Sequence, residues 1–133
     1  MGSDDNKRVV ASFFEAGNRG DMDTCLGLLA DEIRWTNMGS TRFSGTFEGK
    51  QAVLEDLLGP LFGRLKNGIA SEVEDMIAEA DRVVVLSRGT AETADGKPYN
   101  NRYCQIMRLH EGRIVAVTEY MDTALVDETF GRR

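Results

Sequence analysis

Apolar and polar residues alternate through a long stretch in the second half of the chain, residues 81–123. Alternation with a period of two is typical of β-strands, and the pairs Asp95-Gly96 and Glu111-Gly112 are typical of turns between strands. We therefore predict three sequential strands joined by two hairpins. Alternate side chains of a strand point to opposite faces, so the stretch defines the two faces of a wall. We expect the more polar face to line a pocket, and it carries Val84, Leu86, Arg88, Thr90, Glu92, Asn101, Tyr103, Gln105, Met107, Val117 and Glu119.

Three earlier segments carry apolar residues at helical spacing, namely residues 5–19, 21–30 and 49–65. Asp21 is placed to cap the second helix, because its carboxylate can accept a hydrogen bond from the first helical turn. Pro60 has no backbone N–H to donate, so we expect it to kink the third helix or to begin a further turn.

Two shorter segments alternate as strands do, residues 33–37 and 69–77. The first places Ile33, Trp35 and Asn37 on one face, and the glycines that follow it favour a loop. The second has one wet face, which suggests a position near the edge of a sheet. Helices followed by a run of strands predict an α+β domain, in which a cone-shaped, curved antiparallel sheet wraps around three N-terminal helices.

Composition narrows the class of protein. With 133 residues we expect one domain over residues 1–133. The chain is 41% apolar, and we find neither a signal core nor the roughly 20 apolar residues of a membrane span.

A net charge of -6 without a basic block argues against nucleic-acid or membrane partners. Cys25 and Cys104 are expected to be buried free thiols, so we expect a cytoplasmic protein.

Candidate metal and nucleotide sites are not found in the sequence. The chain has one histidine, His110, at a predicted hairpin tip where its side chain would point to solvent. No paired cysteines, no histidine and carboxylate at ligand spacing and no glycine-rich phosphate loop accompany it. We therefore expect neither a metal nor a cofactor, and we do not expect His110 to act in catalysis.

The order of elements and three stretches resemble the nuclear transport factor 2-like superfamily, which includes ketosteroid isomerase, limonene epoxide hydrolase and SnoaL-like polyketide cyclases. The stretches are FFEAGNRGDMDTCLGLLADEIRW, GTFEGKQAV and MRLHEGRIVAVTEYMDT. The resemblance covers nearly the whole chain and implies a cone with a pocket for a small apolar molecule. It also implies a homodimer that packs through the outer sheet face, where we expect Val83, Val85, Cys104, Ile106 and Val115. None of the stretches is a catalytic motif, so they indicate the fold better than the reaction.

The resemblance to ketosteroid isomerase does not extend to its catalytic groups. Phe13, Gln105 and Asn37 stand where that family has a tyrosine, a protonated aspartic acid and a basic aspartate. Neither carboxyl is present, and an amide cannot accept a proton from carbon at neutral pH. A steroid-isomerase mechanism is therefore not expected.

The resemblance to limonene epoxide hydrolase is closer. Trp35 and Asn37 keep the spacing of that enzyme's tyrosine and asparagine, Arg88 resembles its arginine, and Glu119 lies where its last-strand aspartate would be. The similarity implies that Glu119 is a base and that Arg88 orients it or holds an oxyanion. Thr90 stands at the position of the acid, and a hydroxyl is a poor general acid. The epoxide reaction itself is thus in question.

Each candidate residue also has a structural interpretation. Glu119 and Arg88 could form a purely structural ion pair, and Asn37 and Gln105 could be satisfied buried amides. Trp35 is expected to shape the pocket, which Phe13 also lines, and Tyr103 with Asn37 is expected to position water or substrate, whereas Tyr120 faces outward. Two hypotheses follow. The protein is a cofactor-independent isomerase, cyclase or hydrolase with Glu119 as base, or it is a non-catalytic module that binds or senses a small apolar ligand.

Overall fold

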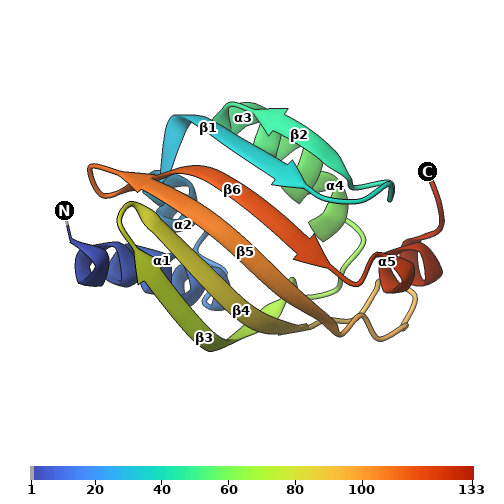
Figure 1. Cartoon of the computed structure of the whole chain (residues 1–133). Coiled ribbons are helices and arrows are strands. Elements are labelled where there is room, and N and C mark those ends of the chain that lie inside the picture. Colours follow the sequence, from blue (N-terminus) through green and yellow to red (C-terminus); the bar gives the residue numbers. More distant parts are fainter. Residues whose placement is uncertain (1) are drawn as a thin grey trace.

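The computed structural model describes residues 2–133, and Met1 lies outside the described residues. Its centre is a curved six-stranded sheet with the strand order β2-β1-β6-β5-β4-β3 (Figure 1). The strands are β1 (Leu29–Asn37), β2 (Gly45–Glu48), β3 (Ala70–Glu79), β4 (Arg82–Thr90), β5 (Asn101–His110) and β6 (Arg113–Met121). The helices are α1 (Ser3–Asn18), α2 (Met22–Leu28), α3 (Lys50–Ala52), the π-helical segment η1 (Val53–Leu58), α4 (Gly59–Phe62) and α5 (Thr123–Phe130).

The helices α1 to α4 lie together on one side of the sheet, and the other side is left uncovered (Figure 1). The predicted α+β cone is confirmed, as is the run of antiparallel neighbours from β3 to β6. None of the helices that the structure describes in residues 2–133 is both long and apolar enough to cross a membrane.

The second and third helical segments follow their local sequence. Asp21 caps α2 as predicted, because its Oδ1 accepts a hydrogen bond from the Thr24 backbone N–H at 3.1 Å. The third segment is not one regular helix but the succession α3, η1 and α4. Pro60 is the second residue of α4, which continues from η1 without a break, and it has no backbone N–H to donate to the preceding turn. The π-helical segment ends at Leu58, two residues before Pro60.

Two features of the sheet were not predicted. The short strand β2 was expected to be loop, because four residues beginning with Gly45 show no clear alternation. The first strand pairs with the last long strand in parallel, which places Trp35 opposite Val117 and Asn37 opposite Glu119. This pairing joins residues about 80 positions apart, and no local pattern specifies such a partner.

The predicted phase of β4 was wrong. Val83 and Val85 are fully buried and Ser87 is nearly so, whereas Arg88 and Thr90 are exposed on the outer face. The physical reason is twofold. A run of consecutive apolar residues, VVVL, carries no alternation of its own, and residues 91–100 form a loop longer than a two-residue turn. Register with β5 decides the phase, since cross-strand neighbours share a face.

The observed phase of β4 also decides which residues form the outer face. Of the residues expected there, Cys104 and Ile106 do lie on it, but Val83 and Val85 belong to the core. Val115 is partly buried beside a register shift between β5 and β6. Other apolar residues on the outer face are Val84 and Leu86 of β4, Ile77 of β3 and Tyr120 of β6.

The core fills one part of the space between sheet and helices. Val10, Leu29, Ile33, Met107 and Val117 are almost completely buried there. Near the C-terminus, the α5 residue Phe130 packs edge-on against Phe43 and Tyr99, with ring centroids 5.3 and 4.8 Å apart. These contacts fill the cone beside α5, whereas a cavity remains that is lined by residues of α1, α2, η1 and α4.

Candidate active site in the cone

A cavity of about 550 Å³ lies between the inner face of the sheet and the helices. Its walls are mainly apolar, with Phe13 and Phe14 from α1, Leu57 and Leu58 from η1, and Phe62 from α4. This is an ordinary size and lining for a site that holds a small organic molecule.

Six of the eight predicted site residues line this cavity. They are Phe13, Trp35, Asn37, Tyr103, Gln105 and Glu119, whereas Arg88 and Thr90 do not reach it. These six come from α1, β1, β5 and β6, where the structure has the predicted residues on the inner face.

The polar members form a row across three strands. Asn37 on β1 stands opposite Glu119 on β6, and Glu119 stands opposite Gln105 on β5. One row along, Trp35, Val117, Met107 and Val83 succeed one another across the same sheet. The polar row is therefore bordered by apolar side chains.

Glu119 is the titratable group of this row. Gln105 Nε2 donates a hydrogen bond to Glu119 Oε1, and Glu119 makes no ion pair with any residue in the range 2–133. Glu119 is partly buried and lines the cavity. Burial raises the pKa of Glu119 to about 7, although the hydrogen bond from Gln105 acts in the opposite direction. Both protonation states of this carboxyl are thus populated near neutral pH.

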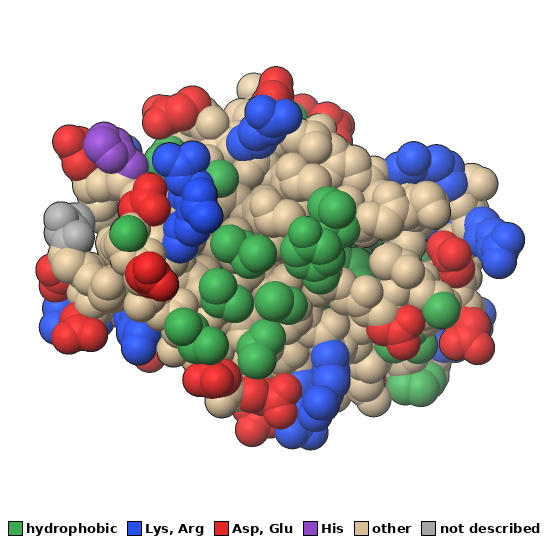
Figure 2. All heavy atoms as spheres, viewed as in Figure 1, with side chains coloured by type: hydrophobic (Ala, Val, Ile, Leu, Met, Phe, Trp, Pro, Cys, Tyr) green, Lys and Arg blue, Asp and Glu red, His purple; other side chains and the backbone are tan. Residues whose placement is uncertain are grey.

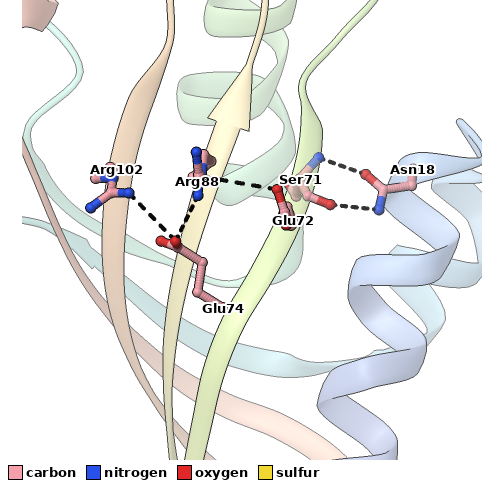
Figure 3. A network of polar contacts seen from close by, with 6 residues as sticks. All are labelled: Asn18, Ser71, Glu72, Glu74, Arg88 and Arg102. Carbon is pink, nitrogen blue, oxygen red and sulfur yellow. Dashed lines mark hydrogen bonds and ion pairs between the residues drawn. The ribbon is translucent and has the colours of Figure 1, made fainter.

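Arg88 belongs to a different network, on the outer face of the sheet. Its Nη2 lies 3.0 Å from Glu74 Oε2 and its Nε lies 3.9 Å from Glu72 Oε2. Arg102 Nη2 reaches the same Glu74 oxygen at 3.4 Å (Figure 3). The predicted pairing of Arg88 with Glu119 is therefore wrong, both as a catalytic arrangement and as a structural one. Thr90, two residues along the same face, is likewise not a pocket residue.

One rim of the cavity is held by Asn18 and Ser71. Asn18 Nδ2 donates to the Ser71 carbonyl at 2.9 Å, and the Ser71 N–H donates to Asn18 Oδ1 at 2.8 Å (Figure 3). Both residues line the cavity. The pair fastens the end of α1 to the start of β3, which is a sheet edge.

The buried amides are only half satisfied. Asn37 Nδ2 donates to the Phe43 carbonyl at 2.9 Å, but Asn37 Oδ1 and Gln105 Oε1 have no hydrogen-bond partner in the described part of the chain. Trp35 Nε1 is likewise buried without an acceptor there. All three side chains belong to residues that are less than 10% exposed, at 5%, 7% and 4% for Asn37, Gln105 and Trp35. The interpretation of Asn37 and Gln105 as fully satisfied core amides is thus wrong.

Tyr103 takes part in a hydrogen-bond chain at the other side of the polar row. Its hydroxyl donates to Tyr99 Oη at 3.3 Å, and Asn101 Nδ2 donates to the same oxygen at 3.1 Å. Burial raises the pKa of both tyrosines above the ordinary value. Tyr103 therefore stays protonated and cannot serve as a base near neutral pH.

Sequence reasoning missed several lining residues. Leu57, Leu58 and Phe62 were recognised only as the apolar side of a helix, and nothing in a periodic pattern separates core from cavity wall. Ser87 was missed because the phase of β4 was wrong. The register of β4 against β5 is the one observation that identifies it.

The cavity also contains a thiol. Cys25 Sγ donates to the Phe13 carbonyl at 3.5 Å, and burial raises the pKa of the thiol, so it is not an activated nucleophile. Among residues 2–133, no three His, Cys, Asp or Glu side chains cluster in a way that could hold a metal ion.

Several solved structures share this fold. A protein of unknown function with the nuclear transport factor 2-like fold from Burkholderia pseudomallei has a TM-score of 0.84 and 23% identity, over 96% of this chain and 97% of that one. Bal32a, from a soil-derived mobile gene cassette, has a TM-score of 0.85 and 26% identity over 95% and 96%. TerC, co-crystallised with polyporic acid, has a TM-score of 0.81 and 19% identity over 93% and 96%.

Sequence comparison supplies the family. A search of curated protein sequences returns no match. The family model described as a SnoaL-like domain matches residues 10–117, which is most of the chain. The match includes the second half of α1, the elements from α2 to β5, and the first half of β6. The chain therefore belongs to the SnoaL-like domain family, and it shares its fold with solved proteins of the nuclear transport factor 2-like type.

Proposed function

We propose that this SnoaL-like protein is a cofactor-independent enzyme that acts on a small, mainly apolar molecule by acid–base chemistry, as an isomerase, cyclase or hydrolase. One observation carries the proposal. Glu119 lies in a mainly apolar cavity without a cationic partner among residues 2–133, and its pKa is about 7. A carboxyl with such a pKa can take up a proton and release it at neutral pH, which is what a general base and acid must do.

The mechanism follows from the two protonation states. Ionised Glu119 removes a proton from a substrate carbon or from a water molecule, and becomes neutral. In an isomerisation the neutral carboxyl then returns the same proton to another substrate atom, which regenerates the carboxylate. Gln105 is a positioning residue, because its amide N–H donates to Glu119 Oε1 and fixes the orientation of the carboxyl plane.

Relatives add general support. SnoaL-like domains bind small molecules, and TerC was crystallised with polyporic acid. From these relatives we carry over one property to this chain, namely that the cone holds a small molecule. The apolar wall favours an apolar ligand, because removing apolar surface from water drives binding.

Hydrogen exchange tests the base without requiring the natural substrate. We would incubate the protein with 2-decalone, a bicyclic ketone, in D₂O and follow loss of the α-proton signals by NMR. Wild-type protein should accelerate exchange, and Glu119→Gln should abolish the acceleration while keeping fold and binding. Arg88→Gln is the matched control, since it also removes one charge but lies on the outer face, and it should exchange at the wild-type rate. Equal rates for Glu119→Gln and wild type would eliminate the assignment.

The second candidate is a non-catalytic module that binds or senses a small apolar ligand. It is favoured by Asn37 and Gln105, which stand where the resembling ketosteroid isomerases have carboxyls. In this case the bicyclic ketone binds, but neither wild type nor Glu119→Gln accelerates exchange.

We also infer that residues 1–133 act as one domain in a cytoplasmic homodimer. The outer sheet face presents a group of apolar side chains at its centre, with charged residues around it (Figure 2). Its exposed members include Ile77, Leu86 and Tyr120, and partly buried Cys104 and Ile106 lie between them. A second copy of the sheet would cover this patch.

A further inference from the structure

The polar row in the cavity, together with Trp35 from the adjacent row, has hydrogen-bonding capacity that the protein does not use. Trp35 Nε1, Asn37 Oδ1 and Gln105 Oε1 are buried and lack partners in residues 2–133, and all three residues line the cavity. A buried donor or acceptor without a partner costs free energy, so polar atoms in this state favour any ligand that supplies one.

We propose that this end of the cavity selects a ligand with a hydroxyl group, whose oxygen accepts from Trp35 Nε1–H and whose hydrogen is donated to Asn37 Oδ1. The inference rests on the proposed small-molecule function of the same cavity. It adds the class of ligand, which is a neutral apolar alcohol, phenol or enol.

The arrangement of β1 supports a shared contact. Trp35 and Asn37 are two residues apart on one strand, so their side chains stand on the same face as neighbours. Asn37 Nδ2 is held by the Phe43 carbonyl at 2.9 Å, which leaves Oδ1 as the open end of that amide. The indole N–H of Trp35 can only donate, and Asn37 Oδ1 can only accept.

The numbers of donors and acceptors decide the ligand group. The unused set consists of one donor, Trp35, and two acceptors, Asn37 and Gln105. An ether or ketone oxygen accepts but does not donate, and an ammonium group donates but does not accept. A hydroxyl group does both, so a ligand with a hydroxyl can satisfy Trp35 and Asn37 with the same oxygen.

Charge argues against an anionic ligand. Among the described residues that line the cavity, Arg19 is the only Lys or Arg, and its Nη2 lies 3.7 Å from the Asp21 carboxylate. A carboxylate or phosphate at the polar row would meet Glu119 without a compensating cation. A neutral hydroxyl avoids this repulsion.

Binding of matched probes tests the proposal. The probes are 2-decalol, its methyl ether, 2-decalone and decalin-2-carboxylate, with affinities measured by isothermal titration calorimetry on the full chain. The alcohol should bind about tenfold more tightly than the ether, which is roughly the effect of one buried hydrogen bond. The carboxylate should bind most weakly at pH 8, where Glu119 is largely ionised.

Two variants assign the preference to residues. Trp35→Phe keeps an aromatic wall without the N–H, and Asn37→Leu removes the acceptor at similar size. Each should reduce the preference for alcohol over ether to about twofold or less. Phe62→Leu is the control, because it changes only the apolar wall and should weaken all four probes by a similar factor.

The outcomes separate this inference from the proposed function. If alcohol and ether bind equally well to wild type, the hydroxyl proposal fails while the small-molecule site stands. A tenfold preference that survives both Trp35→Phe and Asn37→Leu also overturns it. If no probe binds, both the inference and the proposed pocket function are contradicted. The exchange experiment with Glu119→Gln tests the base independently of this preference.

Discussion

Gln105 on β5 lies directly across from Glu119 on β6 and donates a hydrogen bond from its side-chain amide to the Glu119 carboxyl. The hydrogen bond stabilises the charged form, while burial of the carboxyl disfavours it more strongly. A neutral amide at this position allows Glu119 to keep a pKa of about 7, which a cation in the same place would lower.

The first prediction concerns the pH dependence of catalysis. Because the base must be ionised, kcat/KM for ketone exchange should rise with pH and level off above about 7, the pKa of Glu119. Gln105→Leu removes the donor that favours the carboxylate, so the midpoint should move to higher pH. Arg88→Gln should leave the midpoint in place. A Gln105→Leu profile that coincides with wild type would contradict the positioning of Glu119 by Gln105.

A second prediction links the same group to stability. The pKa of Glu119 is raised from 4.5 to about 7 in the folded state, so the folded protein binds more protons than the unfolded chain between these values. The contribution of Glu119 to the free energy of unfolding is therefore greatest below pH 4.5 and is lost as the pH rises to 7. The loss is roughly 3 kcal/mol.

Urea denaturation of wild type and Glu119→Gln at pH 5 and pH 8 measures this effect. The variant has no carboxyl at this position, so its stability relative to wild type should increase between the two pH values. The comparison between the two proteins removes the contributions of other titrating groups. A difference that does not change with pH would show that Glu119 has an ordinary pKa.

The third prediction concerns the outer ion pairs of Arg88. Arg88→Gln should reduce the free energy of unfolding by less than about 1 kcal/mol, because half-exposed ion pairs are screened by water. Glu74→Gln should cost somewhat more, since Glu74 contacts both Arg88 and Arg102. Neither substitution should alter probe affinity in calorimetry. A loss of several kcal/mol from Arg88→Gln would contradict its surface position.

The fourth prediction tests the outer sheet face as a dimer interface. Leu86 is 39% exposed near the centre of the apolar patch, and Leu86→Glu would place a charge inside a dimer contact. Light scattering at micromolar concentration should give a dimer mass for wild type and a monomer mass for the variant. Lys97→Glu, in the loop between β4 and β5, is a control that should remain dimeric. A monomer mass for wild type would refute the interface.

Much of the fold could be predicted from local pattern. The helical spacing of residues 5–19 predicted α1, Asp21 marked the start of α2, and alternation predicted β3, β5 and β6. In β5 and β6 the alternation was clear, so Tyr103, Gln105 and Glu119 were placed on the correct face. These features depend on residues close together in the chain, so their pattern can be recognised in the sequence.

The errors have a common cause in long-range pairing. The apolar run of β4 is compatible with either face, and only its register against β5 puts Val85 inside and Arg88 outside. The parallel contact between β1 and β6, which brings Asn37 beside Glu119, is likewise invisible to local pattern.

The sequence by itself determined that Glu119 belongs to the inner face of a strand in a SnoaL-like cone. The alternation of that strand and the stretches that carry the family resemblance are both local features of the sequence. Only the tertiary structure decided what surrounds that carboxyl. Arg88 is on the other side of the sheet. Gln105 donates a hydrogen bond to the Glu119 carboxyl, and apolar side chains of the helices line the same cavity. A carboxyl pKa depends on desolvation and on partners across the sheet, and both are set by packing between segments far apart in the chain.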